Sequence, residues 1–119
     1  MESKFKKCLP AILENIIKQV TRLIVLNYTK YNDTFYYWFE TNSNYDFIEI
    51  YETNFKWCFL ENFTTESERV LDYYAQHFVH AISTYYEMYR DLTSVQHFIR
   101  IFITKQFKYF DSKQLYLIE

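Results

Sequence analysis

Residues 33–40 read DTFYYWFE and place five aromatic side chains in succession, from Phe35 to Phe39. Aromatic residues are enriched in β-strands, and we interpret this segment as the first strand of a sheet. A strand with one solvated face alternates apolar with polar side chains. Five consecutive rings instead give the predicted strand two aromatic faces, and a single core covers only one of them.

Two further runs downstream have the same character. They cover residues 45–52 and 55–61, and the short segments TNSN and TN separate the three runs, of which the first is residues 34–40. Turn-forming residues between β-rich runs are typical of antiparallel hairpins. The sequence therefore predicts a three-stranded antiparallel meander.

The segment from about residue 8 to residue 27 has a helical period. Its apolar residues recur at steps of three and four positions: Leu9, Leu13, Ile16, Ile17, Val20, Leu23 and Ile24. This spacing predicts an N-terminal amphipathic helix. Pro10 falls in its first turn, where a missing N–H group costs nothing.

Two more helices are predicted after the meander. Thr65 with Glu68, and Thr93 with Gln96, have the spacing of capping boxes that open helices. The apolar stripes that follow are Leu71, Tyr74, Ala75, Phe78, Ile82, Tyr85 and Tyr89, and then Val95, Phe98, Ile99, Phe102, Tyr109 and Phe110. The order of one helix, three strands and two helices predicts an α+β fold, and the length predicts a single compact domain over residues 1–119.

The second face of the predicted meander bears on function. The first face, which we expect in the core, comprises Phe35, Tyr37, Phe39, Ile48, Ile50, Phe55, Trp57 and Phe59. The second face comprises Tyr36, Trp38, Glu40, Phe47, Glu49, Tyr51, Lys56, Cys58 and Leu60. A monomer rarely exposes a large apolar patch, so a helix, a second copy of the chain or a binding partner covers this face. We expect the chain to form a homodimer.

Charge is unevenly distributed behind a net value of −2. Residues 1–32 carry +4, residues 33–72 carry −7 and residues 73–119 carry +1. An acidic, aromatic surface is complementary to a basic groove of a host protein, since opposite charge speeds and orients association. The predicted partner-binding residues are Tyr36, Trp38, Glu40, Asp46, Phe47, Glu49, Tyr51 and Glu52. Direct nucleic-acid binding is not expected, because direct binders usually carry a basic surplus.

Composition excludes several classes of function. The chain has no glycine, which excludes the glycine-dependent phosphate loops, and we expect no cofactor. His77 and His80 share a helical face, but zinc needs two further ligands, so no metal site is expected. Cys8 and Cys58 are too few for a disulfide scaffold, and no apolar run reaches the roughly 18 residues of a membrane span. We therefore expect a cytoplasmic protein with no membrane partner.

Arg90 and His97 enclose six residues in the segment RDLTSVQH. This segment resembles the arginine–histidine motif of HEPN ribonucleases, an all-helical family. The resemblance implies that the two residues, from paired subunits, converge on RNA, with the histidine as acid or base and the arginine as a phosphate clamp. A small ribonuclease is therefore the alternative prediction.

The predicted topology and its acidic sheet are similar to those of some small phage-encoded CRISPR nuclease inhibitors. With 13 Tyr, 12 Phe, one Pro and no Gly, the composition also indicates an AT-rich gene, as found in phages, plasmids, viruses and low-GC bacteria. We predict a non-enzymatic interaction protein of a phage, virus or mobile element that binds and inhibits a host macromolecule through the acidic, aromatic-rich sheet.

Overall fold

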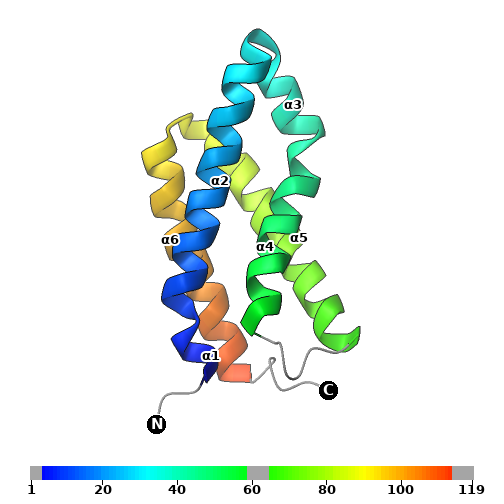
Figure 1. Ribbon diagram of the computed structural model, residues 1–119, viewed down its shortest axis with the longest axis vertical. Helices are drawn as coiled ribbons and strands as arrows, with labels where there is room; N and C mark the ends of the chain where they lie inside the picture. The colour runs from blue at the N-terminus through cyan, green and yellow to red at the C-terminus, as the bar shows by residue number, and fades with distance from the viewer. Residues whose placement is uncertain (1–3, 59–64, 114–119) are drawn as a thin grey trace.

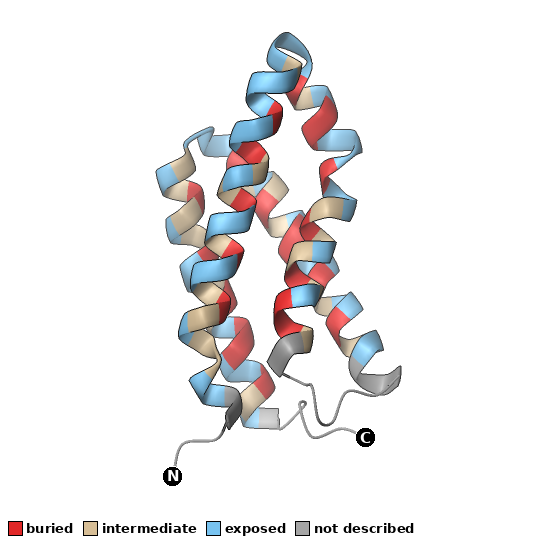
Figure 2. Ribbon diagram, in the orientation of Figure 1, coloured by how far each residue is buried: buried red, intermediate tan, exposed pale blue. Residues whose placement is uncertain are grey.

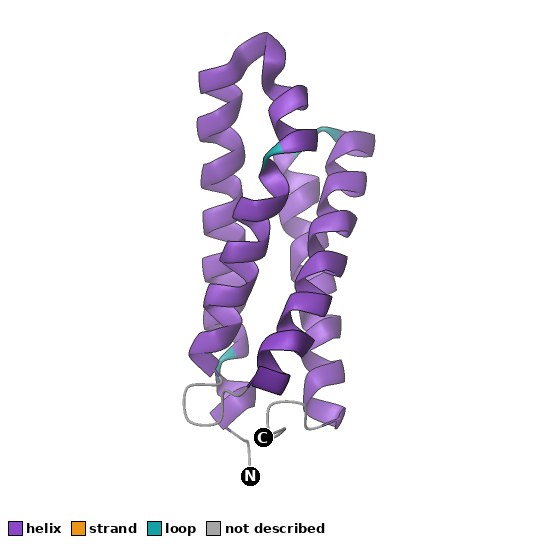
Figure 3. Cartoon of the chain, turned by 90° about the vertical axis from the view of Figure 1, so that its right-hand side faces the viewer, coloured by secondary structure: helices purple, strands orange, loops and turns teal. Residues whose placement is uncertain are grey.

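The computed structural model describes residues 4–58 and 65–113, and their regular structure is entirely helical (Figure 3). No strand occurs in these two ranges, so the predicted α+β fold with its three-stranded meander is wrong. The helices are α1 (Lys4–Lys7), α2 (Leu9–Tyr31), the 3₁₀ turn η1 (Asn32–Thr34), α3 (Phe35–Thr41), α4 (Ser43–Cys58), α5 (Thr65–Tyr89) and α6 (Leu92–Lys113).

The long helices run alternately up and down and form a bundle (Figure 1). Helix α4 packs on α5, α5 on α6, and α2 on both α4 and α6, an arrangement typical of up-and-down helix bundles. Buried residues line the inward side of each long helix, and the outward sides are exposed (Figure 2). The end of α2 and helix α3 extend beyond the turn that joins α5 to α6 (Figure 1).

The segment DTFYYWFE is helical because its largest buried residues also fit a helical period. Phe35, Trp38 and Phe39 are buried at steps of three and four positions, whereas Tyr37 is 70% exposed. Aromatic β-propensity depends strongly on packing context, and here the rings pack against other helices. The second aromatic face of the predicted strand does not exist, because Trp38 and Phe39 point to the same core.

The turn-like residues that separated the predicted strands have other roles. Asn42 ends α3, with its backbone N–H donating to the Trp38 carbonyl at 2.8 Å, so TNSN joins two helices. Asn54 lies within α4, and its side-chain amide donates to the Ile50 carbonyl at 2.8 Å and to Gln19 Oε1 of α2 at 3.1 Å. Asn54 therefore links two helices and forms no hairpin turn.

The three predicted helices are confirmed, with corrections at their ends. Helix α2 continues to Tyr31 and carries Pro10 in its first turn. The predicted box of Thr93 and Gln96 is wrong, because Gln96 Nε2 donates to Thr21 of α2 at 3.0 Å. Asp91 caps α6 instead: its carboxylate accepts from the Ser94 N–H at 3.1 Å and the Ser94 hydroxyl at 2.7 Å, and these bonds lower the pKa of Asp91.

Some predictions concern parts of the chain outside the described residues. The predicted core position Phe59 lies there, as do the side chains of Trp57, Cys58 and Thr65.

Candidate functional site

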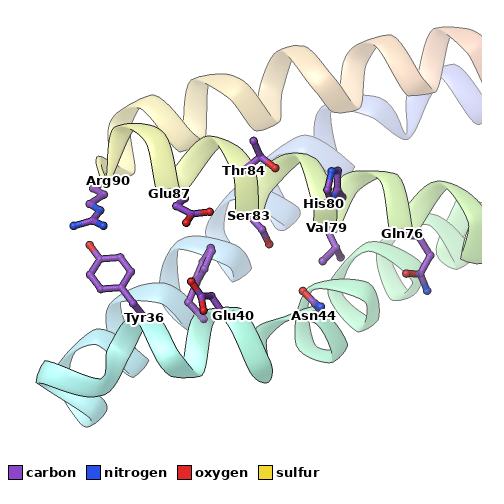
Figure 4. Close-up of a pocket in the computed structure, with 11 residues that line it drawn as sticks. Tyr36, Glu40, Asn44, Gln76, Val79, His80, Ser83, Thr84, Glu87 and Arg90 are labelled. Carbon is purple, nitrogen blue, oxygen red and sulfur yellow. The ribbon is translucent and has the colours of Figure 1, made fainter.

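A polar groove lies between α3, the start of α4, and the facing side of α5 (Figure 4). The chain bends at Asn42, where α3 gives way to α4, and side chains do not fill the space that remains against α5. The groove has a volume of about 410 Å³. Its lining consists of Tyr36, Phe39, Glu40, Asn44, Gln76, Val79, His80, Ser83, Thr84, Glu87 and Arg90.

Tyr36 and Arg90 close one end of the groove, and Asn44 and Gln76 lie at the other (Figure 4). The Arg90 guanidinium lies over the Tyr36 ring, 4.4 Å from its centroid, a distance at which a cation is attracted to the ring. This contact joins the end of α5 to α3.

Arg90 has an unusual backbone conformation at the end of α5. Arg90 has a φ of 50° and donates its N–H to the Tyr86 carbonyl at 2.7 Å. This left-handed position after a helix usually belongs to glycine, which the chain lacks. A side chain costs roughly 1–2 kcal/mol in this conformation, and the contact with Tyr36 offsets part of that cost.

The middle of the groove carries two carboxylates and a buried hydroxyl. Glu40 of α3 and Glu87 of α5 are exposed, and among the described residues no cation lies within ion-pair distance of either. Ser83 Oγ is buried and has no hydrogen-bond partner in the described part of the chain. An unpaired buried polar atom is uncommon in folded proteins. These groups can accept hydrogen bonds from a cationic ligand.

Two of the eight predicted partner-binding residues, Tyr36 and Glu40, come together in the groove. Trp38, Phe47 and Tyr51 lie in the core, with exposed fractions of 5%, 0% and 0%. They form no aromatic surface, because each faces the bundle interior. The predicted homodimer thereby loses the face on which that prediction was based.

The three remaining predicted residues lie on α4, away from the groove lining. Glu49 is exposed, and Asp46 and Glu52 are half-buried. They extend the acidic surface of the molecule along α4, and they do not belong to one site with Tyr36 and Glu40.

The sequence interpretation missed the contribution of α5 to the groove. Gln76, His80, Ser83, Glu87 and Arg90 recur at steps of four and three positions. This spacing defines one side of a helix, opposite part of the predicted apolar stripe. The polar stripe on α5 could therefore be predicted from the sequence, whereas the helix that faces it could not.

Arg90 and His97 do not share this groove. Arg90 lines it, whereas His97 is exposed on α6 between the buried residues Val95 and Ile99. In a helix, the position midway between two such residues faces away from the core. A common site for Arg90 and His97 would therefore need more than one chain.

The two other histidines lie on α5. His77 packs edge-to-face on the Tyr73 ring, with centroids 4.7 Å apart, and His80 lines the groove. Within residues 4–58 and 65–113, no group of three or more His, Cys, Asp or Glu side chains is arranged to hold a metal ion.

The described residues form an all-helical bundle with a polar groove between its helices. No protein-family model, curated protein or solved structure matches the chain. None of the described helices is both long enough and apolar enough to cross a membrane.

Glu52 supplies a pH-dependent prediction. Burial raises the pKa of Glu52 above 4.5, as do the charge of Asp72 and a hydrogen bond to it, and Glu68 acts in the same direction while Lys56 opposes it. A carboxyl group whose pKa is raised by folding stabilises the folded state below its unfolded pKa, and that stability is lost as pH rises through the folded pKa. Solvent screens the interactions of this half-buried carboxylate, so Glu52→Gln should increase stability at pH 7 by no more than about 0.5 kcal/mol.

Urea denaturation at pH 7 and at pH 4 measures this effect. The gain of Glu52→Gln should be smaller at pH 4 than at pH 7, because the raised pKa of Glu52 favours its protonated form as the pH falls. Glu49→Gln, an exposed residue of the same helix, is the control for removing one negative charge. An equal gain at both pH values would contradict the assigned cause.

Proposed function

We propose that the chain is a non-enzymatic interaction protein that binds a basic surface of another macromolecule. The observation that carries this proposal is the set of exposed carboxylates Glu40, Glu49 and Glu87, none of which has a cation within ion-pair distance among the described residues. Carboxylates without an internal partner are available to the cations of a binding partner, and complementary charge speeds association.

The proposed partner is a host protein with a basic, nucleic-acid-binding groove, and the proposed place of binding is the interior of the host cell. The support is the net charge of −7 over residues 33–72, a range that includes α3, α4 and the start of α5. The similarity to CRISPR nuclease inhibitors depended on the meander and no longer supports this choice. Stoichiometric binding through a helical acidic surface replaces binding through a sheet.

Charge reversal tests the proposal. The double variant Glu40→Lys/Glu49→Lys should slow association with a partner recovered from the native host by about tenfold at low salt. Added salt should weaken the wild-type complex through screening. Association rates measured by surface plasmon resonance at two salt concentrations give both quantities.

The matched control is Glu14→Lys, since Glu14 is exposed on α2 within the positively charged N-terminal segment. This variant should associate at nearly the wild-type rate. If Glu14→Lys slows association as much per charge as the double variant, net charge alone controls binding and the acidic surface of α3 and α4 does not.

The HEPN-like ribonuclease remains a second candidate, and the helical fold favours it. The resemblance implies an all-helical protein, and Arg90 and His97 are both exposed, as residues that act across paired subunits must be. Cleavage of RNA by the wild-type chain, abolished in His97→Ala, would replace the binding proposal with this one.

A further inference from the structure

We propose that the groove between α3 and α5 binds an arginine side chain, held between Glu40 and Glu87. This inference rests on the proposed function, because it identifies the chemical group of the basic partner that enters the acidic surface. The occupant is a guanidinium group presented by an exposed segment of the partner.

The charges of the groove favour a cationic occupant. Glu87 points from α5 toward α3, and Glu40 lies on that facing helix (Figure 4). Arg90 also lines the groove, but its guanidinium lies over the Tyr36 ring, 4.4 Å from the centroid. In the described structure it makes no ion pair with Glu40 or Glu87. A cation that enters the groove can interact favourably with both carboxylates.

The hydrogen-bonding groups of the groove favour guanidinium over ammonium. The lining offers two carboxylates, the side-chain oxygens of Asn44 and Gln76, and the unpaired hydroxyl of Ser83. These acceptors are spread along the groove (Figure 4). A guanidinium has five N–H donors in one plane, whereas an ammonium is a compact point charge with three.

The size and floor of the groove suit a long side chain. A volume of about 410 Å³ lies within the range of small-ligand sites. Phe39 and Val79 are buried beneath the polar residues, so they offer apolar contact to the methylene stem of an arginine. A basic nucleic-acid-binding surface presents such arginines.

The test uses N-acetyl-arginine amide as the probe and N-acetyl-citrulline amide as its uncharged, nearly isosteric control. Titration of the ¹⁵N-labelled full chain should give saturable NMR shifts in the amides of Ser83, Thr84 and Glu87 with the arginine compound. The citrulline compound should give none at the same concentrations. N-acetyl-lysine amide should bind more weakly than the arginine compound.

The matched variants are Glu40→Gln and Glu87→Gln, compared with Glu49→Gln on α4. Each groove variant should raise the dissociation constant of the arginine compound about tenfold, the effect expected for loss of one charged hydrogen bond. Glu49→Gln should leave the constant unchanged. Unchanged melting temperatures in all three variants exclude unfolding as the cause.

Equal shifts with citrulline, shifts that map away from α5, or wild-type affinity in both groove variants would overturn the inference. Its failure is distinguishable from failure of the proposed function. If Glu49→Lys abolishes binding of the macromolecular partner and Glu87→Gln does not, the proposed function stands and the arginine site is rejected. If the chain binds the arginine compound but no basic macromolecule, the arginine site stands and the proposed function is rejected.

Discussion

Replacing Phe35 with alanine is expected to lower the free energy of unfolding by about 3–5 kcal/mol, the usual cost of deleting a buried phenylalanine ring. Phe35 is fully buried and joins three helices. Its ring meets Tyr28 of α2 edge-to-face with centroids 5.2 Å apart and Tyr86 of α5 at 6.1 Å. Helix α3 is only seven residues long, so neighbouring turns give it little independent stability. Chemical denaturation followed by circular dichroism measures the change.

Tyr37 provides the matched control for Phe35. It is 70% exposed, and Tyr37→Ala should change stability by no more than about 0.5 kcal/mol. A strand would place the two residues on the same face, so that both substitutions would be costly. The helix places them on different sides. Similar destabilisation by Phe35→Ala and Tyr37→Ala would therefore contradict the helical structure of this segment.

The helices outside residues 32–58 were predictable because their apolar residues repeat over many turns. In α2 the fully buried residues Ile12, Ile16, Val20 and Ile24 follow each other at intervals of four, and no strand pattern competes with this repeat. Helix α5 has an equally clear apolar repeat over its 25 residues. Long periodic segments overcome local ambiguity because each added turn supports the same period.

The secondary structure predicted for residues 35–58 was wrong for reasons that can be identified in the sequence. Bulky aromatic residues occupy both odd and even positions, so the period of two and the helical period fit about equally well. Asn42 and Asn54 imitate turn residues, yet one ends a helix and the other links α4 to α2. The chain has no glycine and its one proline is Pro10, so neither residue marks the ends of elements in this segment.

The groove was predictable only in part. Its polar stripe on α5 can be read from the spacing of Gln76, His80, Ser83 and Glu87. The position of Tyr36 and Glu40 opposite that stripe depends on the bend at Asn42 and on how α3 packs against α2. Such contacts between distant segments arise from tertiary packing, and a local pattern does not contain them.

Replacing Tyr51 with phenylalanine is expected to destabilise the chain by about 1–3 kcal/mol, although it removes only a hydroxyl group. The Tyr51 hydroxyl is fully buried and donates to Gln106 Oε1 of α6 at 2.9 Å. Gln106 Nε2 in turn donates to the Tyr74 carbonyl of α5 at 3.3 Å, so three helices share one polar link inside the core. Without the hydroxyl, Gln106 Oε1 keeps the cost of burial and loses its donor, and a buried polar atom left unpaired costs about this much.

A double-mutant cycle separates this hydrogen bond from other effects of the substitution. Gln106→Leu leaves the Tyr51 hydroxyl unpaired, and Tyr51→Phe leaves the glutamine oxygen unpaired, whereas the double variant leaves neither. The double variant should therefore lose less stability than the sum of the two single variants, with a coupling energy of about 0.5–3 kcal/mol. The ring of Tyr51 still stacks on Phe55 at 4.4 Å after either change, so core packing is nearly constant. An additive cycle, or a neutral Tyr51→Phe variant, would contradict the buried hydrogen bond between Tyr51 and Gln106.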